Sequence, residues 1–279
     1  MSSASYQVDH YENFPVASIL LPRHLRRPVS ILYHFARNAD DFADEGDLPA
    51  AERLRLLGEY RAELDRIAAG QTPLTPLFRD LAGVVAEHEL PLQLFHDLLD
   101  AFVQDVSKTR YAHFGEVMEY CRRSANPVGR LMLHLFKEAE PRNLALSDGI
   151  CSALQLINFW QDVAIDYAKG RIYLPQDEMA EYGVSEEALA QQMAAGTADA
   201  RFKALLMMQI ERSRKILRAG SPLGVRLKGR IGLEIRLIVV GGDTILQKLA
   251  AGGGDVFRHR PVLGARDWPG MIWRALRKR

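Results

Sequence analysis

The helical spacing of apolar residues is the feature that most restricts what this chain can fold into. In residues 51–69, AERLRLLGEYRAELDRIAA, Leu54, Leu57, Tyr60 or Arg61, and Leu64 recur at three-to-four spacing with charged side chains between them, which is typical of an amphipathic helix. Further segments repeat this pattern, and Ser185 followed by two glutamates resembles a capped helix start. These segments are 91–106, 114–138, 147–168, 200–219 and 229–250. Because no clear strand-like alternation occurs, the sequence predicts an all-α fold.

Short glycine- and proline-containing breaks separate these segments, and they are too short to be domain linkers. The breaks fall at 70–76, 140–142, 170–175, 220–222 and 252–254. A length of 279 residues fits one large domain or two modest ones. We expect a single domain over 1–279, with a less regular basic tail at about 255–279.

Composition narrows the possible partners and compartments. With 48% hydrophobic and 25% charged residues, the chain has enough apolar side chains for a substantial core. With a formal charge of only +1, the chain as a whole does not attract the negatively charged nucleic acids, so we expect no nucleic-acid partner. Two cysteines are too few for a disulfide framework, and the N-terminus does not resemble a secretory signal. These features favour a cytoplasmic protein.

Acidic residues follow an apolar run in the stretch ARNADDFADEGD at 36–47. Asp40 and Asp44 are four residues apart, so a helix would place them on one face, with Arg37 on nearly the same stripe. Asp41 would point about 100° away. A single motif of this kind is more often a solvated helix face than a metal site.

A second polar stripe lies in LQLINFWQDVAIDYAKGRIYLP, where Asn158, Asp162 and Asp166 are spaced four apart and Gln155 extends the stripe by one turn. The apolar flanks predict a largely buried helix. Buried carboxylates stay ionised only near cations or several donors. Aspartates from both motifs could therefore bind several Mg²⁺ ions together with a diphosphate. An ion pair with Lys169 or Arg171 is the alternative reading of the second motif.

The segments YHFARNADDFAD, YCRRSANPVG and LQLINFWQDVAIDYAKGRIYLP, in this order, resemble the squalene and phytoene synthases. The resemblance implies a single-domain, all-α isoprenoid-synthase bundle in which the two motifs face each other across a central apolar cavity. It implies metal ligands at Asp40, Asp44, Asn158, Asp162 and Asp166. The residues implied at the reacting centre are Tyr33, Arg37, Tyr120, Gln155, Arg171 and Tyr173. The substrate-binding set is Phe14, Arg37, Phe159, Trp160, Lys169 and Arg171.

Within the family, ENFPVASILLP, SANPVGR and FWQDVAIDYAKGR most resemble hydroxysqualene synthases of bacterial hopanoid biosynthesis. That resemblance implies Mg²⁺-dependent conversion of presqualene diphosphate to hydroxysqualene by diphosphate ionisation, carbocation rearrangement and water capture. No glycine-rich dinucleotide fingerprint follows a strand, so we expect no NADPH. A condensing member, making presqualene diphosphate, squalene or phytoene, is the alternative, followed by a non-catalytic lipid-binding or assembly relative.

The partners expected from this resemblance are a prenyl diphosphate substrate and a presqualene diphosphate synthase that hands it over. The tail at 255–279 has seven Lys or Arg residues interleaved with apolar ones. It is either an interfacial helix that touches the inner face of the cell membrane or a basic, partly docked segment.

Overall fold

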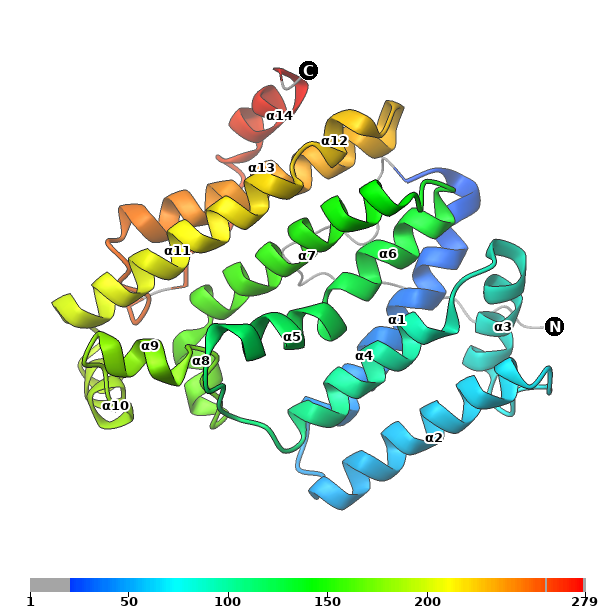
Figure 1. The fold of residues 1–279 in the computed structure, drawn as a ribbon, viewed down its shortest axis with the longest axis horizontal. Helices are drawn as coiled ribbons and strands as arrows, with labels where there is room; N and C mark the ends of the chain where they lie inside the picture. Colours follow the sequence, from blue (N-terminus) through cyan, green and yellow to red (C-terminus); the bar gives the residue numbers. More distant parts are fainter. Residues whose placement is uncertain (1–20, 259, 278–279) are drawn as a thin grey trace. The chain divides into compact units, whose positions relative to one another are not determined.

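The computed structural model describes residues 21–258 and 260–277, so the substrate-binding assignment of Phe14 lies outside the described residues. Within these ranges the chain is helical, and the only β-type pairing is an isolated parallel bridge between Arg110 and Ile172 (Figure 1). The all-α prediction is therefore confirmed.

The contacts of the chain group into two compact units, with α5 and α7 contributing residues to both. The first unit comprises 1–108 and 123–144, and the second comprises 109–122 and 145–279. The single-domain expectation stays a prediction. Helices of the first unit are η1 (Arg23–Leu25), α1 (Arg26–Asp44), α2 (Ala50–Ala68), α3 (Pro76–His88), α4 (Leu92–Asp105) and α6 (Asn126–Leu135). The others are α5 (Phe114–Ser124), α7 (Pro141–Gln161), α8 (Val163–Ala168), α9 (Gln176–Glu181), α10 (Glu186–Ala195), α11 (Ala200–Gly220), α12 (Leu223–Arg226), α13 (Gly229–Ala251) and α14 (Trp268–Arg277).

Helix α1 is the centre of the first unit, because α2, α3 and α4 all pack against it. Its Phe35 is fully buried, and the ring meets those of Phe78 and Phe95 edge-on at centroid distances of 5.8 and 5.2 Å. Such aromatic pairs add to the stabilisation from burial alone. This packing orients α1 and therefore its acidic stripe.

Arg53 of α2 fixes the C-terminal end of α1. Its guanidinium donates hydrogen bonds to the carbonyls of Phe42, Glu45, Gly46 and Leu48 at 2.6 to 3.1 Å. The last carbonyls of a helix have no partner within the helix, so these bonds satisfy groups that would otherwise depend on water. The end of α1 that carries Asp44 is thereby held.

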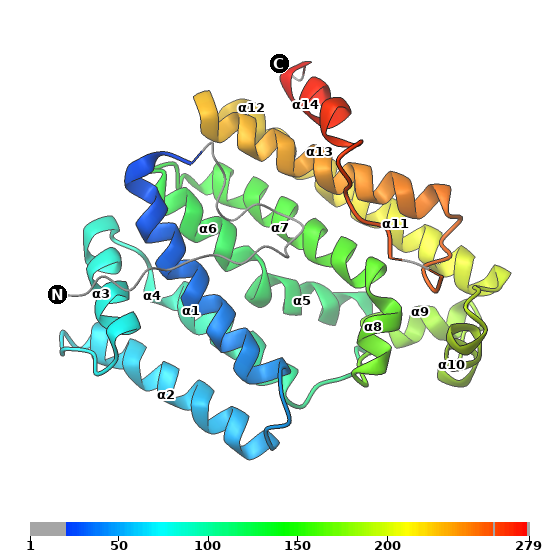
Figure 2. The same ribbon diagram turned by 180° about the vertical axis from the view of Figure 1, so that it is seen from behind.

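In the second unit, α13 lies between α11 and α14 (Figures 1 and 2). Helix α7 approaches α11 closely at Gly220, where an added Cβ would lie only 2.6 Å from the carbonyl oxygen of Leu146. No larger residue fits there without movement of a backbone. This contact fixes the position of α7, which carries the second polar stripe.

Helix boundaries differ from the sequence expectation at two prolines and one aspartate. The helix expected at 147–168 begins earlier, at Pro141, and is divided at Asp162 into α7 and α8. Proline is tolerated in a first helical turn, so Pro141 starts a helix here. The helix expected at 114–138 is two helices divided at Ala125, because Pro127 cannot continue the hydrogen-bond ladder of α5.

The tail after Gly254 is more regular than expected, since α14 forms within it and buries Met271 and Ala275 against α13. Among the described residues no helix is both long enough and apolar enough to cross a membrane.

Arg110 joins three segments of the second unit. Its guanidinium forms paired 2.8 Å hydrogen bonds with the carboxylate of Glu186 and donates to the carbonyl of Gly170 at 2.6 Å. The Ile172 N–H donates to the Thr109 carbonyl at 3.0 Å. These bonds hold the loop of 169–174, which carries Arg171 and Tyr173.

We expect Glu186→Gln to lower the free energy of unfolding by about 0.5 kcal/mol at pH 7, a typical value for an exposed ion pair. The hydrogen bond and charge of Arg110 lower the pKa of Glu186 below its usual value of 4.5. This stabilisation is therefore complete above pH 4.5 and disappears as the pH falls through the lowered pKa. Urea unfolding of wild type and variant across this pH range checks it, with Glu181→Gln as control. A wild-type-to-variant difference that persists unchanged at the most acidic pH would contradict the assignment.

Candidate active site

The second polar stripe remains helical although α7 ends at Gln161. The Asp162 N–H donates to the Asn158 carbonyl at 2.9 Å, and the Asp166 N–H donates to the Asp162 carbonyl at 2.8 Å. These bonds span four residues, as in an α-helix. Asn158, Asp162 and Asp166 therefore keep the one-turn backbone spacing that the sequence predicts.

Arg260 supplies a cation to this stripe. Its Nε pairs with Oδ1 of Asp162, its Nη2 lies 3.1 Å from Asp162 Oδ2, and the same Nη2 lies 3.3 Å from Asn158 Oδ1. The Asp162 side chain is 14% exposed and that of Arg260 is 25% exposed. Partial burial strengthens the attraction relative to a surface pair.

The segment that carries Arg260 is anchored on both sides. Buried Gln161 donates to the carbonyl of Pro261 at 2.5 Å, and Phe257 packs on Phe202 with ring centroids 4.6 Å apart. Asp255 accepts hydrogen bonds from Thr197 and Ala198 at 3.3 and 3.2 Å. Arg260 is thus held at the stripe by the fold of the loop.

Aromatic rings lie beside the stripe. Phe159 and Tyr173 stack with centroids 3.7 Å apart and planes within 7°, and the Tyr120 ring lies 5.9 and 5.7 Å from them. Tyr111 stacks on the other side of this group, 5.4 Å from Tyr173. The face of an aromatic ring carries a negative quadrupole, which attracts cations.

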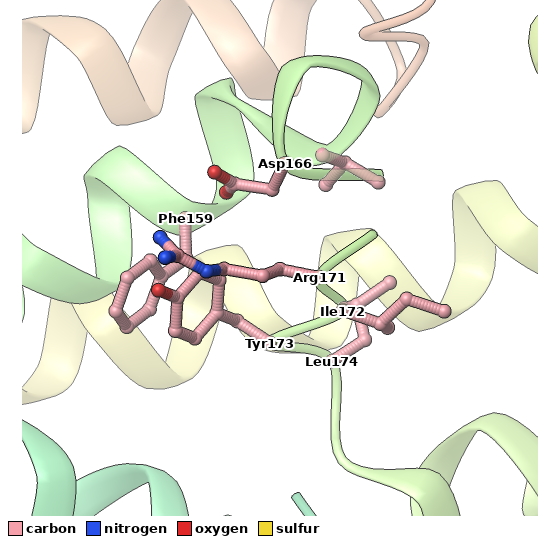
Figure 3. Close-up of a pocket in the computed structure, with 7 residues that line it drawn as sticks. Phe159, Asp166, Arg171, Ile172, Tyr173 and Leu174 are labelled. Carbon is pink, nitrogen blue, oxygen red and sulfur yellow. The ribbon is translucent and has the colours of Figure 1, made fainter. Parts of the chain in front are cut away.

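A small pocket opens between the aromatic pair and α8. Figure 3 shows the Arg171 guanidinium beside the stacked rings of Phe159 and Tyr173, with the Asp166 carboxylate on the same side. The pocket is lined by Phe159, Val163, Asp166, Arg171, Ile172, Tyr173 and Leu174. Four residues predicted from the sequence, Phe159, Asp166, Arg171 and Tyr173, therefore meet at one place.

Other predicted residues of the second unit occupy different environments. Trp160 is fully buried, and its Nε1 donates a 2.8 Å hydrogen bond to Ser213, which is a packing environment. Gln155 is half-buried on α7, and Lys169 is exposed at the end of α8. Ile165 is 49% exposed, so the burial expected along this helix does not extend to that face of α8.

Cys121, beside Tyr120, is fully buried. Burial raises the pKa of its thiol to about 12. A thiol in this state carries almost no thiolate at neutral pH and is a poor nucleophile.

Arg37 organises the first motif, on α1. Its Nε lies 2.9 Å from Asp41 Oδ1, one Nη lies 3.1 Å from Glu45 Oε1, and the other lies 3.9 Å from Asp40 Oδ2. Burial lowers the pKa of Arg37, but these carboxylates outweigh it, and the net shift is upward. The carboxylates of Asp40 and Asp41 are 46% and 39% exposed, so this motif is more open to water than Asp162. Tyr33 lies one turn earlier on α1, half-buried.

Oxygen donors in these arrangements suit a hard divalent cation, which binds carboxylates, amide oxygens, water and phosphate oxygens. Asp162 and Asn158 already direct their oxygen atoms at one positive group, Arg260. Among the described residues, no three His, Cys, Asp or Glu side chains gather as a complete metal site.

Arg260 is the functional candidate that the sequence reasoning missed. It follows Asp162 by 98 residues, in a tail whose sequence predicted either an interfacial helix or a basic, partly docked segment. The seven basic residues of the tail showed that it is positively charged, but their spacing did not indicate which of them contacts the acidic stripe.

Comparisons with known proteins indicate one enzyme family. A family model described as squalene/phytoene synthase matches residues 8–267. The hydroxysqualene synthase of Rhodopseudomonas palustris is 39% identical over 241 residues, covering 85% of this chain and 79% of the relative. A phytoene synthase of Cereibacter sphaeroides is 34% identical over 230 residues, covering 80% and 62%.

Among solved structures, the squalene synthase HpnC of Alicyclobacillus acidocaldarius superposes with a TM-score of 0.79 at 34% identity, covering 88% of this chain and 90% of that one. The resemblance seen in the three sequence segments is thereby confirmed over most of the chain. Together with the family match, it places this all-α chain among the enzymes of the squalene/phytoene synthase family.

Proposed function

We propose that this enzyme converts presqualene diphosphate to hydroxysqualene. The observation that carries the proposal is the oxygen-rich stripe of Asn158, Asp162 and Asp166, lying beside the stacked rings of Phe159 and Tyr173. The stripe suits a diphosphate bound through cations, and the rings suit a cationic hydrocarbon. The similarity to the hydroxysqualene synthase of Rhodopseudomonas palustris supports the choice of reaction.

Mg²⁺ is the proposed metal, with Asp40, Asp44, Asn158, Asp162 and Asp166 as its ligands. When bound, it would neutralise negative charge on the departing diphosphate. Arg171 lies beside Asp166 in the pocket and would contact diphosphate oxygens, as Arg37 would from the first motif. Lys169 would add a further positive charge next to Arg171. The family expectation that both motifs line one cavity stays a prediction.

The chain's own residues would then control the cation. The faces of Phe159, Tyr173 and Tyr120 would stabilise the rearranging carbocation, and the buried ring cluster would exclude bulk water. Bond breaking releases diphosphate, and capture by one water forms the C–O bond with loss of a proton. The polar residues Ser124 and Asn126 of the SANPVG segment are compatible with a reaction that uses water. Gln155 and Tyr33 would orient the substrate.

We further propose that the enzyme works in the cytoplasm at the inner face of the membrane, where it receives its substrate from a presqualene diphosphate synthase. The substrate and its C30 product each carry long apolar chains, which partition into lipid. The second candidate function is condensation of two prenyl diphosphates, and it is favoured by the similarity to a phytoene synthase.

The two candidates are separated by product analysis. Purified enzyme with Mg²⁺ receives either presqualene diphosphate or farnesyl diphosphate, and the products are identified by mass spectrometry. We expect hydroxysqualene from presqualene diphosphate, with oxygen from ¹⁸O-labelled water in the product. Formation of presqualene diphosphate, squalene or a phytoene-like hydrocarbon from farnesyl diphosphate alone would overturn the specific proposal.

Asp162→Asn is expected to lower kcat by at least about 10²-fold, the scale found when one electrostatic group is removed from an active site. The substitution keeps the shape of the side chain and removes its charge. Turnover is compared with wild type, and far-UV circular dichroism confirms an intact helical fold. Asp177→Asn, at an exposed aspartate of α9, is the matched control and should keep full activity. Full activity of the Asp162 variant would end the metal proposal.

Arg260→Gln is expected to tighten substrate-free binding of Mn²⁺, used as a spectroscopic substitute for Mg²⁺. Arg260 places its positive charge on Asp162 and Asn158, so a metal ion must compete with it. We expect about fivefold tighter binding, the ~1 kcal/mol of a partly exposed ion pair, measured by electron paramagnetic resonance. Arg258→Gln, which alters a neighbouring arginine bonded to the Gly196 carbonyl, is the control. Equal or weaker Mn²⁺ binding by the Arg260 variant would show that the two cations do not compete.

A further inference from the structure

Helix α14 exposes an apolar sector although it is packed on α13. Met271 and Ala275 are buried against α13, whereas Trp268, Ile272, Trp273 and Leu276 are 41% to 57% exposed. These four exposed residues lie within about 140° of the helix circumference. Two exposed tryptophans on one short helix are unusual for a surface that meets only water, because each leaves a large ring hydrated.

Helix α12 extends this apolar sector on the same side of α13. A single guanidinium, that of Arg236 in α13, donates to the Ala275 carbonyl of α14 at 2.8 Å and to the Gly224 carbonyl of α12 at 2.5 Å. The two helices therefore lie close together, as Figures 1 and 2 also show. Val225 of α12 is 51% exposed.

Positive charge accompanies the apolar residues. The segment 218–230, RAGSPLGVRLKGR, has four basic residues and no acidic one. Arg226, Lys228 and Arg230 of this segment are exposed. Residues 266–279 add five basic residues against Asp267, which is itself paired with Lys248 at 2.6 Å. The Arg277 guanidinium lies over the ring of Trp273, 4.1 Å from its centroid.

We propose that the exposed residues of α12 and α14, with the start of α13, form a surface that binds the anionic headgroups of a lipid membrane. We call it the α12–α14 surface, and it comprises Val225, Arg226, Lys228, Arg230, Trp268, Ile272, Trp273, Leu276 and Arg277. Tryptophan rings favour the headgroup region, and each Lys or Arg near an anionic leaflet adds attraction. Because the positive charge of this surface complements anionic headgroups, a lipid membrane fits it better than an apolar protein partner does.

The inference deepens the proposed function, since it supplies the membrane contact that such a substrate and product call for. It specifies a peripheral contact, with side chains reaching the interface and no element crossing it. The readout of lipid binding needs no substrate, so it is independent of which reaction the enzyme catalyses.

Vesicle co-sedimentation tests the surface. Full-length protein is mixed with vesicles of phosphatidylcholine alone or of phosphatidylcholine with phosphatidylglycerol, at low and at high salt. We expect binding to the anionic vesicles to be at least about tenfold stronger than to the neutral ones, and to weaken with salt. Equal binding to both vesicles, or no binding to either, would overturn the proposal.

Two double variants test which residues carry the binding. Lys228→Glu with Arg230→Glu reverses charge, and Ile272→Ser with Trp273→Ser removes apolar contact; each should weaken anionic-vesicle binding at least about tenfold. The matched controls are Arg201→Glu, at the far end of α11, and Leu74→Ser, at an exposed leucine of the first unit. Circular dichroism verifies folding. Variants that bind vesicles like wild type would overturn the proposal.

Two further measurements separate this proposal from its alternatives. If the variants convert a wild-type dimer to a monomer in light scattering without losing lipid binding, the surface is an interface between copies and the proposal fails. Turnover of detergent-solubilised presqualene diphosphate should be unchanged in both double variants. Absent turnover in wild type would refute the proposed reaction and leave the lipid result standing.

Discussion

The pairing of Asp162 with Arg260 is the interaction on which the candidate site depends. The Asp162 side chain is only 14% exposed and follows fully buried residues such as Trp160, so a nearby positive charge offsets part of the water that its carboxylate loses. Arg260 provides this charge from a loop that Gln161 and Asp255 hold in place. The fold thus directs oxygen atoms of Asn158 and Asp162 at a cation. In the proposed function, metal ions that bind the diphosphate would take the place of Arg260 at these oxygen atoms.

The two acidic motifs differ in what stabilises the negative charge of their carboxylates. On α1, Arg37 pairs with three carboxylates that are about half exposed, so water also stabilises their negative charge. On α7 and α8, the stripe is less exposed and its partner comes from far along the chain. Asp41 is the carboxylate nearest to Arg37, because the two residues are four apart and lie only about 40° from each other around the helix.

Local patterns in the sequence predicted much of this molecule. Residues 51–69 and 200–219 were expected to be helices, and α2 and α11 match them within a residue. The spacing of Asn158, Asp162 and Asp166 predicted a shared stripe, because that stripe depends only on backbone hydrogen bonds four residues apart. Contacts between residues far apart in the chain could not be predicted from the sequence. Neither the partnership of Arg260 with Asp162 nor the joining of α12 and α14 by Arg236 leaves a periodic signal.

The central claim is that the acidic stripe holds metal ions together with the substrate diphosphate. The most direct measurement is a crystal structure with Mn²⁺ and a slowly reacting thio-diphosphate analogue of the substrate, with anomalous diffraction locating the metal. The account predicts Mn²⁺ within coordination distance of Asp162 and diphosphate oxygens beside Arg171, with Arg260 moved away from Asn158. An analogue bound in the protein with Arg260 still on Asp162 and no anomalous peak at the stripe would contradict it.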